Sequence, residues 1–256
     1  MYHSRCLRST APLAALAYLA SGALLLLALP AQALLWALTF PFDRNRALAG
    51  RFIRLVAVLV SRTFPPWRLR VEGTWPGPGP YVVVANHQSM LDILLLARLP
   101  REMKWMAKES LFRIPWLGWM FTLAGDIRVR RGDRESGSGA VRRGRDYLAR
   151  GMSVMIFPEG TRNRDGALRP FKSGAFRLAV DAGVPVLPVA VWGTAGGMPR
   201  GGPWVRPCRA TARLLPPVRA AGYGPGAAAA LRDEVRARIA EALSAGGAGP
   251  GAEAAG

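Results

Sequence analysis

The residue types best suited to proton transfer stand where an apolar run ends. The stretch NHQSMLD, residues 86–92, follows the strand-like residues 81–85 and holds His87 and Asp92 five positions apart. Five residues of a regular helix place two side chains about 140° apart, so His87 must lie in the turn before a helix for Asp92 to reach it. There the carboxylate can accept the Nδ1–H proton and leave Nε2 as a general base. Taken alone, the pattern equally fits a structural histidine held by hydrogen bonds.

A second polar stretch, FPEGTR at residues 157–162, follows another apolar run. Gly160 permits a tight turn with exposed backbone N–H groups, and the guanidinium of Arg162 can hold two oxygens of a phosphate monoester. Glu159 could orient that arginine or bind a substrate hydroxyl. An ordinary strand-to-loop turn with a Glu–Arg ion pair explains the same residues.

A third stretch, GDIRVRR at residues 125–131, contains three arginines. Alternation along a strand places Arg128 and Arg130 on one face and Arg131 on the other, so only some of them can face a ligand. A solvated basic edge strand explains these residues equally well.

Few residues support other kinds of catalysis. The chain has two cysteines, Cys6 and Cys208, and two histidines, of which only His87 lies away from the N-terminus. These counts exclude a disulfide framework and a Cys-rich zinc site, and we predict neither a metal nor another cofactor. Ser89 could act as a covalent nucleophile, but no G-x-S-x-G turn surrounds it, which disfavours an acyl-enzyme.

The charge balance indicates an anionic partner. The 256 residues include 35 Lys+Arg and 16 Asp+Glu, a formal net charge of +19. Such an excess suits nucleic acid or an anionic membrane surface, although arginine used as a general surface cation would give the same count. Residues 9–42 carry no charge, which favours the membrane over nucleic acid.

The uncharged segment is long enough to anchor the chain. About 20 apolar residues span a bilayer, so residues 9–42 can cross once or enter and return near Pro30. A cleaved secretory signal ending at residues 31–33 is the alternative, but the apolar run continues past that point. Arginines follow the run, which predicts that the rest of the chain lies on the cytoplasmic side of the inner membrane.

The remaining pattern predicts an α/β domain. Residues 46–64 read as an amphipathic helix that either lies along a membrane interface or packs on the domain. Short apolar runs then alternate with helical stretches. We predict strands at residues 67–71, 81–85, 103–107, 127–130, 154–157 and 186–191, and helices at 91–99, 110–123, 140–150, 172–182 and 227–243. The expected units are an anchor and interfacial helix (1–64), the α/β domain (65–243) and a disordered tail (244–256).

Taken in order, NHQSMLD, GDIRVRR, FPEGTR and VPVLPVAV (residues 184–191) resemble the four sequence blocks of the glycerolipid acyltransferase superfamily. The resemblance covers residues 81–192 and is strongest to the bacterial 1-acylglycerol-3-phosphate acyltransferases. It implies a central mixed sheet flanked by helices. It also implies transfer of a fatty acyl group from acyl-CoA or acyl-carrier protein to the free hydroxyl of 1-acylglycerol-3-phosphate, giving phosphatidic acid without an acyl-enzyme.

The resemblance also assigns residues to roles. It makes His87 the general base and Asp92 its partner, and it makes Pro185 and Pro188 residues that shape the site and the acyl-donor side. The positions that match acceptor-binding or basic positions of the family are Glu159, Gly160, Thr161, Arg162, Arg131, Lys108 and Lys172.

One departure leaves the acceptor open. Arg128 and Arg130 stand where typical members carry an aromatic and an acidic or small polar residue, which predicts a more cationic pocket. Another lysolipid, such as a lyso-aminolipid, is therefore an alternative acceptor. A protein that binds anionic membranes without catalysis, and a thioesterase or lipid hydrolase, are the alternatives from other functional classes.

Overall fold

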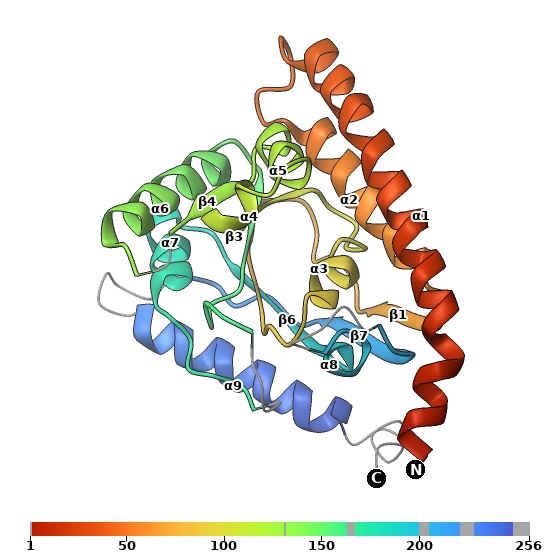
Figure 1. The fold of residues 1–256 in the computed structure, drawn as a ribbon. Coiled ribbons are helices and arrows are strands. Elements are labelled where there is room, and N and C mark those ends of the chain that lie inside the picture. The colour runs from red at the N-terminus through yellow and green to blue at the C-terminus, as the bar shows by residue number, and fades with distance from the viewer. Residues whose placement is uncertain (1, 131, 163–166, 200–204, 221–227, 248–256) are drawn as a thin grey trace.

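A seven-stranded sheet forms the centre of the computed structural model, which describes residues 2–130, 132–162, 167–199, 205–220 and 228–247 (Figure 1). Its strands lie in the order β1-β7-β6-β2-β5-β3-β4. Their bounds are β1 Trp67–Glu72, β2 Val82–Ala85, β3 Met103–Lys108, β4 Ile127–Val129, β5 Ser153–Ile156, β6 Val186–Trp192 and β7 Cys208–Leu214.

Both strand directions occur in this sheet. Neighbouring strands are parallel except β6 and β7, which are antiparallel. The predicted mixed sheet is therefore confirmed, and each of the six predicted strands is present. The seventh strand, β7, was not predicted, because its sequence CRATARL alternates arginine with small residues and carries little apolar signal.

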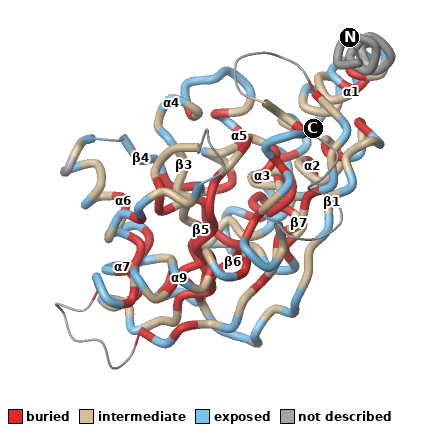
Figure 2. The backbone as a smooth tube through the Cα atoms, turned by 90° about the horizontal axis from the view of Figure 1, so that it is seen from below, coloured by how far each residue is buried: buried red, intermediate tan, exposed pale blue. Residues whose placement is uncertain are grey.

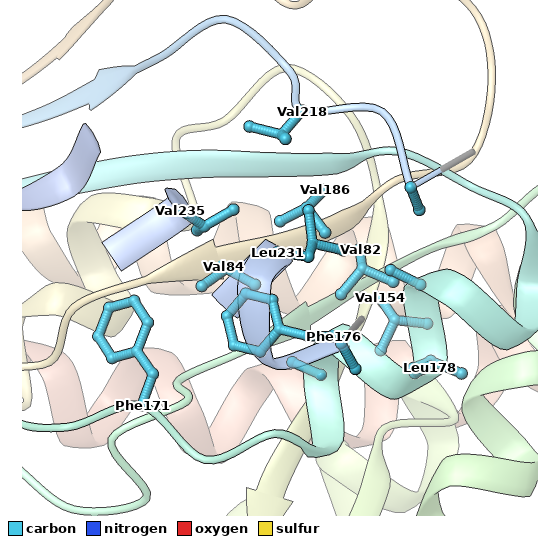
Figure 3. Close-up of a cluster of buried hydrophobic side chains, with 14 of the residues drawn as sticks. Val82, Val84, Val154, Phe171, Phe176, Leu178, Val186, Val218, Leu231 and Val235 are labelled. Carbon is cyan, nitrogen blue, oxygen red and sulfur yellow. The ribbon is translucent and has the colours of Figure 1, made fainter. Parts of the chain in front are cut away.

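Helices cover the sheet on both sides because its central strands are buried on both faces. Val82, Val84 and Val154 point to one face and pack against α6 (Arg134–Ala149), α7 (Gly174–Ala182) and α9 (Ala228–Gly247), as Figure 3 shows for part of this cluster. Val83 and Met155 point to the other face and pack against α3 (Leu91–Leu96). In Figure 2 the buried stretches run along β5 and β6.

The N-terminal helix α1 (Tyr2–Thr39) runs without a break through Pro30, so the chain does not reverse there. It reverses after Thr39 and continues as α2 (Ala47–Arg62), whose first turn is capped by the Asp43 carboxylate accepting the backbone N–H groups of Ala47 and Leu48 at 2.8 Å. Helix α1 lies along the side of the domain (Figure 1). The buried side chain of Gln32 fixes it there by donating to Ala49 O at 3.0 Å and Met120 O at 3.1 Å.

One face of α1 is apolar and exposed. Within residues 12–39 of this helix, a window of 18 residues has a mean hydropathy of 2.1, and the segment is long and apolar enough to cross a membrane. Small residues such as Ala14, Ala17 and Ala28 are buried against the domain, and some leucines of the same face are partly buried beside them. The exposed large side chains of this helix are Leu16, Tyr18, Leu19, Leu26, Leu27, Leu34 and Leu38.

Two helix predictions were wrong in detail. The helix predicted over residues 110–123 is two short helices, α4 (Glu109–Phe112) and α5 (Leu117–Ala124), because Pro115 disfavours a helical conformation in the residue before it. Helix α9 ends at Gly247, so residues 244–247 are helical and do not belong to a tail; residues 248–256 lie outside the described residues. A further short helix, α8 (Thr194–Gly197), was not predicted.

A buried ion network joins α2 to the sheet. Lys104 is fully buried and donates to Ala124 O at 2.8 Å, Arg46 O at 3.0 Å and Glu102 Oε1 at 3.3 Å. Arg54 of α2 pairs with Asp126 at 2.5 Å, and Asp126 also accepts the backbone N–H of Trp105 at 3.0 Å. A Cβ on Gly50 would overlap the Glu102 carboxylate, so a glycine is needed where α2 crosses the network.

Candidate active site

His87 lies in the turn between β2 and α3. Asn86 fixes the start of that turn, because its side chain donates to Val191 O and accepts from Val191 N, both at 2.7 Å. This amide pair continues the pairing of β2 with β6 by one residue after the strand ends. His87 is therefore held at the carboxyl ends of parallel strands, where ligand sites gather in α/β domains.

Asp92, in the first turn of α3, reaches back to the imidazole as the sequence predicts. His87 Nδ1 and Asp92 Oδ2 are 2.7 Å apart, and Asp92 is fully buried. The same oxygen accepts the backbone N–H groups of Gln88 at 2.7 Å and Ser89 at 2.9 Å. Because three groups converge on Oδ2, the carboxylate is fixed in position, and with Asp92 ionised Nδ1 is the donor and Nε2 the free basic nitrogen.

An aromatic ring sets the plane of the imidazole. Phe157 stacks on His87 with ring centroids 4.1 Å apart and an interplanar angle of 21°, and Trp105 meets Phe157 edge-on at 6.3 Å. Neither aromatic residue was given a role from the sequence. The available signal was the position of Phe157 at the end of β5, directly before the Pro-Glu-Gly-Thr-Arg residues.

Glu159 connects the two polar stretches. Its Oε1 accepts the backbone N–H of His87 at 2.7 Å, and its Oε2 accepts that of Arg169 at 3.2 Å. The residue is 5% exposed, and burial raises the pKa of its carboxyl group. Both carboxylate oxygens of Glu159 thus accept hydrogen bonds from the backbone. The geometry therefore favours a role for Glu159 in positioning the His87 turn, and it disfavours an ion pair with Arg162 or a contact with substrate.

Glu159→Gln is expected to lower kcat about 10- to 100-fold with little change in the KM for the acceptor. The glutamine amide oxygen can accept the backbone N–H of either His87 or Arg169, but its NH2 group then faces the other N–H. That backbone N–H loses its hydrogen bond, and a buried group without a partner costs about 1–3 kcal/mol. Steady-state kinetics would measure both constants, with Glu72→Gln on β1 as a half-exposed control. A raised KM at unchanged kcat would instead show that Glu159 contacts the acceptor.

A cavity of about 710 Å³ opens beside His87. One part of its wall is apolar, and another part carries positive charges and hydrogen-bonding groups. A site for an amphiphilic molecule requires both parts. The apolar part includes Met90, Ile93, Met106, Leu111, Val141 and Ile156, and the polar part includes His87, Gly160, Thr161, Arg162, Lys108 and Lys172.

The turn at Gly160 brings Lys172 to the cavity. Gly160 has φ +70°, and a Cβ there would lie 3.1 Å from Cε and Nζ of Lys172. Lys172 also donates its backbone N–H to Pro158 O at 2.9 Å. The positive φ favours glycine at this position, and the absence of a side chain leaves room for the end of Lys172.

Comparison with known proteins decides the family. The acyltransferase family model matches residues 68–192. The 1-acyl-sn-glycerol-3-phosphate acyltransferase alpha of Mus musculus is 36% identical over 200 residues, which cover 75% of this chain and 70% of the mouse protein. The chain belongs to the acyltransferase family.

Other relatives agree. A 1-acyl-sn-glycerol-3-phosphate acyltransferase of Chlamydomonas reinhardtii is 41% identical over 167 residues, which cover 64% of this chain and 50% of the algal protein. The chain thus spans about half the length of that relative. The crystal structure of the 1-acyl-sn-glycerophosphate acyltransferase PlsC from Thermotoga maritima matches with a TM-score of 0.76 and 27% identity, over 97% of this chain and 98% of the other.

The arginines of the third stretch, residues 125–131, have different surroundings in the structure. Arg128 is exposed and lies over the Phe112 ring, with Nη2 donating to Thr122 Oγ1 at 2.9 Å. Arg130 lines the cavity but pairs with Glu109 through two contacts of 2.9 and 3.2 Å. The strand ends at Val129 and Arg130 follows it, yet both arginines lie on the side of α4, where the hydrogen bond from Arg130 and the charges of both lower the pKa of Glu109. Arg131 lies outside the described residues.

Other predicted positions support the fold around the site. Ser89 is buried and donates its hydroxyl to Met198 O at 2.9 Å, and it does not line the cavity. Pro188 sits in β6 opposite Val84, and Pro185 O accepts the backbone N–H of Val82 at 3.1 Å. Among the described residues no group of three His, Cys, Asp or Glu side chains is arranged to hold a metal ion.

Proposed function

We propose that this acyltransferase transfers a fatty acyl group from acyl-CoA or acyl-carrier protein to the free hydroxyl of 1-acylglycerol-3-phosphate, giving phosphatidic acid. The observation that supports this best is the cavity in which His87, held from behind by Asp92, faces the same space as Arg162 and Lys172. A base, a cationic cradle and apolar walls are the groups that such a reaction needs. The relatives named above are acyltransferases of 1-acyl-sn-glycerol-3-phosphate by name.

In the proposed reaction His87 acts as a general base. Nε2 takes the proton of the acceptor hydroxyl as its oxygen attacks the thioester carbonyl, and Asp92 stabilises the imidazolium that forms. The C–S bond then breaks, and the thiolate leaves with the proton from Nε2. No acyl-enzyme is needed, and Ser89 is turned away toward Met198 O.

In the same proposal the phosphate of the acceptor binds near the Gly160 turn. Arg162 offers a planar fork to two phosphate oxygens, Lys172 adds a second positive charge, and Thr161 adds a hydroxyl. Arg130 contributes less because Glu109 pairs with it. Lys108 lines the cavity and remains available to either substrate.

We also propose that the chain acts on the cytoplasmic side of the inner membrane. Its lipid-facing surface is the exposed apolar face of α1, continued by Trp116 and Trp119, which are 39% and 55% exposed. Tryptophan favours the interface of a bilayer, and arginines after the apolar segment favour the cytoplasmic side. A membrane surface would supply both lipid substrates.

The test is a panel of acceptors given to the purified chain in lipid vesicles with labelled acyl-CoA. We expect label in phosphatidic acid when 1-acylglycerol-3-phosphate is present, and much less product from lysolipids with amine or choline head groups. Acyl-carrier protein is the second donor arm. Label in free fatty acid would support a hydrolase, and acylation of a lyso-aminolipid alone would refute the proposed acceptor.

Arg162→Lys is expected to raise the KM for 1-acylglycerol-3-phosphate about tenfold with a smaller change in kcat. Lysine keeps the charge but loses the bidentate geometry of the guanidinium, so a charge-assisted hydrogen bond worth about 1.5–3 kcal/mol is lost. Initial rates at varied acceptor concentration would measure this. Arg70→Lys, on the exposed edge of β1, is the matched control, and an equal effect of both substitutions would contradict a phosphate contact at Arg162.

A further inference from the structure

A second cavity, of about 390 Å³, lies between α2 and the segment that follows α3. None of its lining residues lines the active-site cavity. Its wall contains five arginines and one carboxylate, Glu102. The arginines are Arg51, Arg54, Arg62, Arg98 and Arg101.

The carboxylate does not neutralise this cavity. Glu102 contacts Lys104 at 3.3 Å and Arg54 at 3.9 Å, and Arg54 is further paired with Asp126. Within the described part of the chain, the other four arginines have no carboxylate within 4.0 Å of a side-chain nitrogen. About four positive charges in the cavity wall are therefore without a carboxylate partner among the described residues.

Arg98 is the most constrained of these arginines. Its Nη2 donates to Ser61 Oγ at 2.7 Å, while its Nε is buried without a hydrogen-bond partner among the described residues. Burial and the neighbouring charge of Arg62 lower the pKa of Arg98. The guanidinium groups of Arg62 and Arg98 repel each other, and Nε of Arg98 still has a proton to donate. An oxyanion that binds between them offsets the repulsion and accepts that hydrogen bond.

The surroundings indicate where the anion comes from. Leu48, Arg51, Leu55 and Arg62 lie along one exposed face of α2, so apolar and cationic side chains alternate on it. Leu55 is 54% exposed and also lines the cavity. Exposed leucines beside arginines are typical of a helix that lies at a lipid interface. There the leucines contact acyl chains and the arginines contact lipid phosphates.

We propose that this cavity binds the phosphate group of an anionic membrane lipid, at a site separate from the acyl-transfer centre. Arg62, Arg98 and Arg101 contact the phosphate oxygens, and Leu55 and Val58 contact the upper part of the acyl chains. The bound lipid holds α2 against the membrane surface. Since α2 is joined to the sheet by the Arg54–Asp126 pair, the lipid also orients the catalytic domain.

The test compares full-length variants for binding to two kinds of phosphatidylcholine vesicle. One kind carries phosphatidate, and the other carries a carboxylate amphiphile at equal surface charge. Arg62→Gln/Arg101→Gln removes two cavity charges that make no ion pair, and Arg68→Gln/Arg70→Gln on β1 removes two exposed charges elsewhere. Arg98 is left in place because it supports Ser61.

We expect the cavity variant to lose its partition onto phosphatidate vesicles about tenfold or more, and the β1 variant to change far less. The preference for phosphatidate over carboxylate vesicles is lost only in the cavity variant. Equal losses in both variants, or equal losses on both vesicle types, would overturn the proposal, because general electrostatic attraction then explains the binding.

Two further arms separate the alternatives. In detergent, inorganic phosphate is compared with chloride at matched ionic strength for its effect on Tm. Phosphate protection that depends on Arg62 and Arg101, without any vesicle preference, would assign the site to free phosphate and refute the lipid. His87→Ala is expected to bind both vesicle types as the unsubstituted chain does, so a failure of the lipid site and a failure of the acyl-transfer proposal give different results.

Discussion

His87→Ala is expected to lower the rate of acyl transfer about 10²- to 10⁴-fold, the usual contribution of a general base. The substitution removes the only imidazole near the cavity but leaves Asp92 with two backbone N–H donors, from Gln88 and Ser89. The surrounding turn therefore keeps its shape, and the chain still folds and binds membranes. Turnover of labelled acyl-CoA with 1-acylglycerol-3-phosphate would measure the loss.

Ser89→Ala is the control for this prediction. Its hydroxyl bonds to Met198 O and caps Leu91 N at 3.3 Å, so we expect a change in kcat of less than about tenfold. An acyl-enzyme trapped on Ser89, or a His87→Ala variant that works at nearly the original rate, would refute a direct transfer assisted by His87.

Lys104→Met is expected to destabilise the folded chain by about 3–5 kcal/mol, because it leaves part of a buried ion network without its partner. Burial lowers the pKa of Lys104 and raises that of Glu102, so each group depends on the other to remain charged inside the protein. The substitution also removes the donor shared by Arg46 O and Ala124 O. Urea unfolding in detergent would measure the change in the free energy of unfolding.

The matched control is Lys108→Met in the same strand. Lys108 is exposed, so its substitution is expected to change the free energy of unfolding by less than about 0.5 kcal/mol. If both methionine variants unfolded at the same urea concentration, the ion network would contribute little to holding α2 on the sheet. A loss of stability confined to Lys104→Met would support it.

Much of the fold follows from local patterns. Short apolar runs predicted six of the strands, because a strand buried on both faces needs apolar residues at nearly every position, as in VVVA of β2. The same reasoning missed β7, since Ala210 and Ala212 are small and stand between arginines. That strand is held by its pairing with β1 on one side and β6 on the other, which no local pattern shows.

The contact of His87 with Asp92 could also be predicted, because only five residues separate them and a turn followed by a helix fixes their approach. The part played by Glu159 could not. Its oxygens are taken by the N–H groups of His87 and Arg169, and His87 is 72 residues away in the sequence. No local pattern shows which backbone group a buried carboxylate will meet.

The sequence by itself determined which polar groups could form the site, an imidazole with its acid and an arginine after a glycine turn, and it determined the apolar N-terminal segment. Only the tertiary structure decided that this segment lies along the domain, that Arg130 is paired with Glu109, and that five arginines line a cavity separate from the one beside His87. The physical reason is the order of the strands: the sheet places β2 beside β5 and β3 beside β4, and thereby brings together side chains that are far apart along the chain.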